Sequence, residues 1–422
     1  MIKMESIFYT TTPALKGRVK QRYSDFMVEE VLEDGYTCKI ERFNKTWEER
    51  GFRERMTIRE KTGEEHLLLD MEKINTDTIS AIAMVSRGLN VSKKRVGYAG
   101  LKDKRAITCQ RISLYMPNPA LVEKFGVKGI ELRNPIWSNK RIELGELKGN
   151  KFIIIIRDIS KNEEETKKIL DEFITQAAKG VPNYFGNQRF GGKRMITHKV
   201  GKLMLKGEFE GAIKMYLTET YEEEKEELKN ARINLAKTWD YKQALKEYPF
   251  DARSERAIIN HLVKYPNDYS GSFQTLPKKI RYLFSHAVQS DIFNKILEER
   301  IREYGEKALD IIEGDVLVNG IPAIILPGYE SYFANEKAGE IEKRVLTNEE
   351  VNFSDFKTEK MGELSSKGDR KEIKLIPANF KIEKIEKDEF NEGKIAVTLS
   401  FFLTKGNYAT TVLKELLKEE VF

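Results

Sequence analysis

The sequence contains few of the residues from which proteins build metal centres and disulfide frameworks. Its 422 residues include two cysteines, Cys38 and Cys109, and four histidines, none in a HExxH, HxH or CxxC pattern. Two thiols can form neither a disulfide framework nor a four-thiolate zinc site. We therefore expect no metal site, and the scarcity of cysteine fits a cytoplasmic protein.

Long hydrophobic runs are also missing. No stretch of 18 or more apolar residues is present, so we expect no membrane-spanning helix and no membrane partner. The first 20 residues contain no apolar core, so we expect no secretory signal. Neither GxGxxG nor GxxxxGKS occurs, which argues against a dinucleotide or P-loop site.

Positive charge is concentrated in two segments of a chain whose net charge is only +6. The segment 87–111 has one acid, Asp103, and residues 173–207 have none. Their basic residues are Arg87, Lys93, Lys94, Arg95, Lys102, Lys104, Arg105 and Arg111, then Lys179, Arg189, Lys193, Arg194, Lys199, Lys202 and Lys206. Two basic segments on a nearly neutral background favour a polyanion-binding surface. The alternative is an ordinary solvated surface rich in lysine and glutamate.

The order of expected elements indicates an α+β fold in two or three units. Apolar spacing predicts helices over 78–88, 163–178, 283–301 and 410–417, and largely helical structure over 197–246. Short alternating or fully apolar runs predict strands at 66–71, 96–99, 107–115, 152–156 and 395–399. Residues 347–371 are polar and predict a mobile loop. Because no βαβ rhythm is present, we expect a mixed, mostly antiparallel sheet flanked by helices.

One acidic residue stands out in the first basic segment, within Gly97-Tyr98-Ala99-Gly100-Leu101-Lys102-Asp103-Lys104-Arg105-Ala106-Ile107-Thr108-Cys109-Gln110. The cations around Asp103 favour its ionised form. An ionised carboxylate in a basic groove could serve as nucleophile or base on a phosphate-bearing substrate. The alternative is a salt-bridged aspartate in a turn.

A second segment, Pro182-Asn183-Tyr184-Phe185-Gly186-Asn187-Gln188-Arg189-Phe190-Gly191-Gly192, combines aromatic rings, amides and an arginine. Such side chains can stack on a base, hydrogen-bond its edges and hold a phosphate. The alternative is a packed aromatic turn.

These segments resemble motifs of the TruD family of pseudouridine synthases. Residues 97–110 are similar to the family's GxKDxxAxTxQ motif, and residues 183–191 to NYFGxQRFG. Further similarities, in chain order, lie at VKQRYSDFMVEE (19–30), KINTDT (73–78), LGELKGN (144–150) and GNYATTVLKEL (406–416). The resemblance covers almost the whole chain, and the length of the region 205–377 is closer to archaeal and eukaryotic members than to the shorter bacterial ones.

The resemblance implies a catalytic domain formed by residues 1–204 and 378–422, with residues 205–377 as an inserted α/β TRUD domain. It also implies an RNA pseudouridine synthase that isomerises uridine in tRNA without a cofactor, at position 13 of the D-arm, while related members modify other RNAs. It leaves residues 43–65 without a match, and oligomeric state is not indicated.

The same resemblance implies the roles of the site residues. Asp103 is the expected catalytic residue, attacking C1′ or abstracting the 2′ proton, and Lys20 is expected to pair with it. Phe185 is expected to stack on the flipped uracil, while Phe26 could pack the pocket wall or stack on RNA. The other expected substrate-binding residues are Asn75, Lys102, Thr108, Gln110, Asn183, Gln188 and Arg189.

Two other functions remain open from the sequence. One is an RNA-binding protein built on an inactive synthase scaffold, and the other is a glycosylase that releases free base. A nuclease is disfavoured, because no acidic cluster for Mg²⁺ surrounds Asp103.

Overall fold

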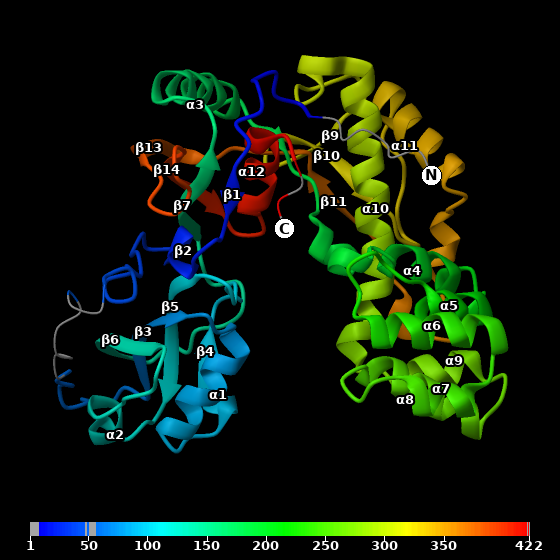
Figure 1. The fold of residues 1–422 in the computed structure, drawn as a ribbon, viewed down its shortest axis with the longest axis horizontal. Helices are drawn as coiled ribbons and strands as arrows, with labels where there is room; N and C mark the ends of the chain where they lie inside the picture. The colour runs from blue at the N-terminus through cyan, green and yellow to red at the C-terminus, as the bar shows by residue number, and fades with distance from the viewer. Residues whose placement is uncertain (1–7, 47–48, 50–55, 420, 422) are drawn as a thin grey trace. The chain divides into compact units, whose positions relative to one another are not determined.

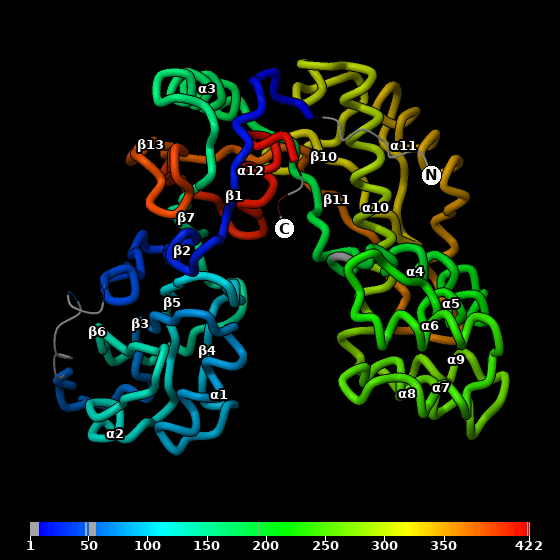
Figure 2. Tube along the Cα trace, viewed as in Figure 1, coloured from blue at the N-terminus to red at the C-terminus, as the bar shows by residue number. Residues whose placement is uncertain are grey.

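The computed structural model describes residues 8–46, 49, 56–419 and 421 (Figures 1 and 2). The chain divides into two compact units. Residues 10–181 and 376–421 form the first, called here the sheet unit, and residues 182–375 with Phe8 and Tyr9 form the second, called the helical unit. The expected boundary at 204/205 therefore differs from this division, because Val200 and Met204 are buried in the core of the helical unit. Which unit is catalytic and which is inserted stays a prediction.

A nine-stranded sheet organises the sheet unit. Its main path runs β13-β14-β7-β2-β5-β3-β6, with β1 paired to β7 and β4 to β5. The strands are β1 (Arg18–Val19), β2 (Phe26–Val31), β3 (His66–Ile74), β4 (Val96–Tyr98), β5 (Ile107–Tyr115), β6 (Ile130–Ser138), β7 (Gly149–Ile159), β13 (Ala378–Lys387) and β14 (Ile395–Thr404). Only β2 and β5 pair in parallel; the other paired strands are antiparallel. The fold is therefore α+β with a mostly antiparallel sheet, as expected.

Side chains alternate between the two faces of this sheet. On one face, Met71 of β3 and Ile112 of β5 pack with Ala81 and Val85 of α1 (Thr78–Gly88), and we call this the α1 face. On the opposite face, a separate small cluster contains Cys38, Ile40, Ile107 and Cys109. The odd and even residues of β5 thus belong to different environments.

Further helices complete the sheet unit. They are α2 (Pro119–Glu123), α3 (Glu163–Ala177), α12 (Ala409–Leu417) and the 3₁₀ turns η1 (Tyr23–Asp25) and η2 (Lys93–Arg95). Phe173 of α3 lies edge-on to Phe380 of β13, with ring centroids 6.0 Å apart. Helix α3 therefore covers the end of the sheet formed by β13.

The helical unit is built around one long helix, α10 (Lys278–Tyr304). The remaining elements are η3 (Asn187–Phe190), η4 (Gly192–Arg194), α4 (Thr197–Leu205), α5 (Phe209–Thr218), α6 (Glu226–Thr238), α7 (Tyr241–Glu247), α8 (Arg253–Lys264), α9 (Tyr269–Gln274), η5 (Gly305–Lys307), β9 (Val316–Val318), β10 (Ile321–Leu326), α11 (Glu336–Asn348), η6 (Phe353–Phe356), η7 (Gly362–Leu364) and β11 (Asp369–Glu372). Strands β9, β10 and β11 form an antiparallel sheet. Two short strands, β8 (Val181–Pro182) and β12 (Lys374–Leu375), lie where the chain passes between units.

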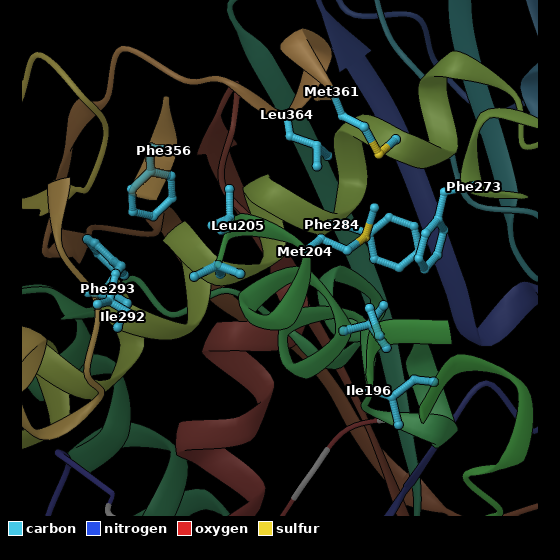
Figure 3. Close-up of a cluster of buried hydrophobic side chains, with 14 of the residues drawn as sticks. Ile196, Met204, Leu205, Phe273, Phe284, Ile292, Phe293, Phe356, Met361 and Leu364 are labelled. Atoms are coloured by element: carbon cyan, nitrogen blue, oxygen red, sulfur yellow. The ribbon is translucent and has the colours of Figure 1, made fainter. Parts of the chain in front are cut away.

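The core of the helical unit explains why one sequence expectation is wrong. Phe356, Met361 and Leu364 are buried and join the side chains of α10 in one apolar cluster (Figure 3). The segment 347–371 is therefore anchored to the core and is not a mobile loop. The sequence did not reveal these anchors or a fourth one, Val351, because their spacing is too irregular to match a helix or strand.

Several expected elements are confirmed. The predicted helix over 78–88 and strand over 107–115 match α1 and β5 residue for residue. Helix α1 starts where the Asp77 carboxylate accepts a hydrogen bond from the backbone N–H of Ser80. Among the described residues, no helix is long and apolar enough to cross a membrane.

Candidate active site

Asp103 forms an ion pair with Lys20, as the sequence predicts. The Lys20 Nζ lies 3.1 Å from Asp103 Oδ2 and 4.0 Å from the centroid of the Phe26 ring. The side chain of Lys20 is 10% exposed and that of Asp103 is 42% exposed. The Lys20 ammonium is therefore buried while the Asp103 carboxylate is exposed, so the pair presents an accessible acid beside a fixed positive charge.

The backbone around Lys20 directs its side chain. Lys20 follows β1 and has a φ of 60°, in the left-handed region, so the chain changes direction there. The Asp25 carboxylate then accepts a hydrogen bond of 2.7 Å from the Arg22 N–H, and β2 begins at Phe26. Phe26 is buried, which places its ring beneath the ammonium group. Phe26 is 1% exposed, so its ring has almost no surface for a ligand in this structure.

Lys73 holds the Asp103 loop from within the sheet unit. Its Nζ donates to the backbone carbonyl of Asp103 at 3.0 Å and to that of Thr76 at 2.6 Å. Lys73 is fully buried, and this desolvation lowers the pKa of its ammonium to about 8. The sequence motif contained this lysine, but we had not assigned it a role. Its signal was a charged residue in register with Leu67, Leu69 and Met71, the apolar residues of β3 that face α1.

A second ion pair, which is buried, fixes Lys102, the residue before Asp103. Lys102 Nζ lies 2.5 Å from Glu30 Oε2, and the Lys102 side chain is only 4% exposed. The Lys102 backbone N–H donates to Thr78 Oγ1, and that hydroxyl donates to Gln110 Oε1. The Gln110 amide donates in turn to the carbonyl of Gly100. Both ends of the loop 100–106 are thus tied to the sheet and α1.

A cavity of about 750 Å³ opens beside this loop, and we call it the edge cavity. It is lined by side chains from the chain before β2, the end of β3 and the start of β5, together with residues 43–46. Asn75, one of the expected site residues, is exposed and lines it with a φ of 50°. The Asn75 N–H donates to the Ala106 carbonyl, which joins the two loops.

The second motif forms an ordered cluster in the helical unit. Asn294 of α10 accepts a hydrogen bond from the Phe185 N–H and donates one to the Phe185 carbonyl, both 2.9 Å long. The Phe185 ring lies edge-on to Phe293, with centroids 5.4 Å apart. Arg189 donates to Ser290 and lies 5.2 Å from the Phe185 centroid, while Gln188 is exposed. The motif thus fixes one half-buried aromatic ring.

Lys371 of β11 was not expected near this ring. Its Nζ lies 4.9 Å from the centroid of Phe185 and donates to the carbonyl of Asn183 at 2.6 Å. Burial lowers the pKa of Lys371 to about 7. Asn183 is buried, and its amide donates to the carbonyl of Glu372. No sequence signal marked Lys371, because its segment alternates basic and acidic residues.

The expected basic surfaces are smaller than the sequence indicates. In the first segment Lys102 and Arg111 are buried in ion pairs, whereas Lys104 and Arg105 are exposed beside Asp103. In the second segment Arg194 is largely buried, and Lys202 and Lys206 pair with Glu349 and Glu350 of the same unit. A run of like charges along the sequence is therefore partly neutralised by residues distant in the chain.

Burial separates the expected site residues into two groups. Asp103, Asn75, Phe185, Gln188 and Arg189 keep exposed or half-exposed side chains. The others lie within the units: Lys20, Phe26, Lys102, Thr108, Gln110 and Asn183. Thr108 Oγ1 and Asn183 Oδ1 have no hydrogen-bond partner in the described part of the chain. Residues of the buried group can shape the site, but they have little surface for RNA in this structure.

Comparisons with known proteins show the family to which the chain belongs. The family model described as "tRNA pseudouridine synthase D (TruD)" matches residues 3–320 and 318–416. A Methanosarcina acetivorans protein named "Probable tRNA pseudouridine synthase D" is 39% identical over 98% of this chain and 95% of its own. A Methanocaldococcus jannaschii relative named "Probable tRNA pseudouridine synthase D 1" is 32% identical, over 98% of each chain.

A solved structure shares the fold. The crystal structure of a TruD protein from Methanosarcina mazei superimposes with a TM-score of 0.80 and 37% sequence identity. The match covers 98% of this chain and 96% of the other. The matched region therefore includes residues of both units.

Proposed function

Because the chain belongs to the TruD family of tRNA pseudouridine synthases, we propose that it isomerises uridine to pseudouridine in tRNA, at position 13 of the D-arm. The observation that carries the proposal is the ion pair between Asp103 and Lys20 above the Phe26 ring. It supplies one reachable carboxylate with a fixed counter-charge. We also propose that no cofactor takes part and that the activity is cytoplasmic, where the two buried thiols stay reduced.

The chemistry requires one bond between base and sugar to be exchanged for another. The N1–C1′ bond of uridine breaks, the uracil turns, and C5 bonds to C1′; C5 then loses its proton and N1 gains one. Asp103 acts as a nucleophile on C1′ or as the base that removes the 2′ proton, and it is regenerated in both routes. Lys20 stabilises the carboxylate in its ionised form before attack and as it leaves.

A uridine inside a folded RNA must leave its stack to reach a carboxylate. We propose that Phe185 stacks on the extruded uracil, and that Arg189 and Gln188 contact RNA beside it. Asn294 supports this role, because its two hydrogen bonds fix the backbone from which the ring projects. Lys102, Thr108, Gln110 and Asn183 are proposed to act by shaping the site, since each is buried.

Tritium release provides the direct test. A tRNA transcript labelled with tritium at C5 of uridine should lose tritium to water with the wild type and retain it with Asp103→Asn. Asp171→Asn is the matched control, because Asp171 is also an exposed carboxylate in a lysine ion pair of the sheet unit. Asp103→Asn should still bind the transcript.

Three results would contradict the proposal. Tritium release by Asp103→Asn above background would remove the catalytic role of this carboxylate. Free uracil in the products would indicate a glycosylase. Pseudouridine at a position other than 13 in a digest of the wild-type product would leave the reaction in place and overturn the proposed target.

A further inference from the structure

The edge cavity lies next to both members of the ion pair, yet neither Asp103 nor Lys20 lines it. We propose that it is a subsite for the base of the nucleotide adjacent to the target uridine. This inference rests on the proposed function, because it concerns how the same RNA is held. Three features of the cavity support the inference: its place at the ends of β3, β2 and β5, the face of the sheet to which it opens and the chemistry of its walls.

The cavity lies one residue along the chain from each member of the pair. Gln21 follows Lys20 and Lys104 follows Asp103, and both line the cavity. Consecutive Cα atoms are about 3.8 Å apart, so one nucleotide step along an RNA strand can reach from the carboxylate to the cavity. Its volume of about 750 Å³ is within the usual range of small-molecule sites, so it has room for a nucleobase.

The cavity and the ion pair belong to opposite faces of the sheet, at the end where β3 stops and β2 and β5 begin. Ile107 lines the cavity and packs with the cluster on the opposite face, as does Ile74. Lys73 and Thr108, one residue away on the same strands, face the α1 side with the Asp103 loop. Adjacent residues of a strand point to opposite faces. An RNA strand crossing these strand ends would therefore direct the target base to one face of the sheet and the adjacent base to the other.

The walls offer what an unstacked nucleotide needs. Tyr23 is 39% exposed and offers an aromatic ring, Asn75 is exposed and offers an amide, and Ile74 contributes a partly exposed apolar side chain. Lys104 and Arg105 are exposed and form no ion pair within the described residues, so both can meet phosphates. Aromatic stacking with nearby cations is the usual combination at sites for single-stranded nucleic acid.

One wall is also rigid before RNA arrives. Arg22 pairs with Glu389 at 3.2 Å and lies 3.5 Å from the centroid of the Phe390 ring. The Asn391 amide donates to Gln21 at 3.1 Å. The turn between β13 and β14 thus braces the segment that carries Tyr23. A braced wall lowers the cost of ordering the site when a base binds.

The experiment removes the neighbouring base and the ring that should hold it. Single-turnover rates are measured on tRNA transcripts with an abasic residue 5′ or 3′ to the target uridine, or three positions away. The wild type should lose about 5- to 100-fold in rate with one of the adjacent abasic residues and none with the distant one. Tyr23→Ala should show a similar loss on intact RNA and no further loss on that abasic RNA.

Controls keep the outcome decisive. Tyr115→Ala removes a ring of similar exposure from the same unit and should leave the abasic effect unchanged. If Tyr23→Ala is unfolded by circular dichroism, Arg105→Ala replaces it and should reduce the same effect. The inference is overturned if neither adjacent abasic residue slows the wild type, or if the losses from the variant and the abasic residue multiply. Because all comparisons use RNAs that the wild type converts, failure of the proposed function would appear separately, as no conversion at all.

Discussion

The buried ammonium of Lys73 donates a hydrogen bond of 3.0 Å to the backbone carbonyl of Asp103, the residue whose side chain pairs with Lys20. Two lysines thus hold one aspartate, one by its main chain and one by its carboxylate. The first sets where the loop lies and the second sets the charge environment of the acid. These contacts lead to separate predictions.

Lys73→Met should lower kcat with little change in the dissociation constant for RNA. The loss of two hydrogen bonds frees the Asp103 loop, and misplacement of a reacting group by about 1 Å can cost on the order of 100-fold in rate. The two constants are obtained from single-turnover kinetics and filter binding. A larger effect on RNA binding than on kcat would contradict the positioning role.

The same lysine predicts a pH dependence. Burial lowers its pKa to about 8, with Asp103 and Asp77 opposing and Lys102 adding to that shift. As pH rises through about 8, Lys73 loses its charge and its hydrogen bonds to the two carbonyls weaken. The wild-type kcat should therefore fall above pH 8, whereas Lys73→Met should be low and flat. Lys73→Arg keeps a cation and should restore part of kcat without the fall; a wild-type profile that is flat to pH 9.5 would refute this.

Lys20→Met should slow catalysis more than it weakens RNA binding. Its ammonium stabilises the reacting carboxylate directly, so a rate loss of about 100-fold is expected. Lys16→Met is a close control, because Lys16 is exposed and also has a left-handed backbone, with a φ of 53°. Equal effects of the two variants on kcat would show that the ion pair has no special role.

Phe185→Ala should cost about 1–3 kcal/mol in kcat/KM if its ring stacks on the extruded uracil. Because part of this ring packs in the core of the helical unit, thermal unfolding must be measured alongside. Phe250→Ala is the control, since Phe250 is the most exposed large hydrophobic residue described in that unit. Normal kinetics for a folded Phe185→Ala protein would remove the stacking role.

The two lysines that flank Asp103 in the sequence should respond differently to salt. Lys104→Ala removes an exposed charge, so the slope of log affinity against log salt should decrease by about 1. Lys102→Met instead leaves Glu30 buried without its partner and should lower stability by about 3–5 kcal/mol, with no change in that slope. Salt titrations and urea unfolding of both variants separate the two effects.

The sequence by itself determined the family and the fold class, and it predicted that Asp103 pairs with Lys20, as the structure shows. It also predicted the elements whose apolar spacing is regular, such as α1 and β5. It did not predict β6 or β13. Each of these strands contains a register shift against its partner, and Asn134 in β6 and Asn379 in β13 have left-handed backbones. An extra residue in a strand interrupts the alternation on which strand prediction depends.

Only the tertiary structure decided which lysine charges are exposed and unpaired, and so available to bind RNA. Lys102 and Lys104 are equivalent in a one-dimensional pattern, but Glu30, far away in the sequence, removes the first from the surface. Lys202 and Lys206 keep exposed surface, but their charges are paired with Glu349 and Glu350, which are also distant in the sequence. Likewise, Lys73 became a support for Asp103 only when β3 paired with β5. Local composition cannot determine burial and ion pairing, because both depend on which distant segments the fold brings together.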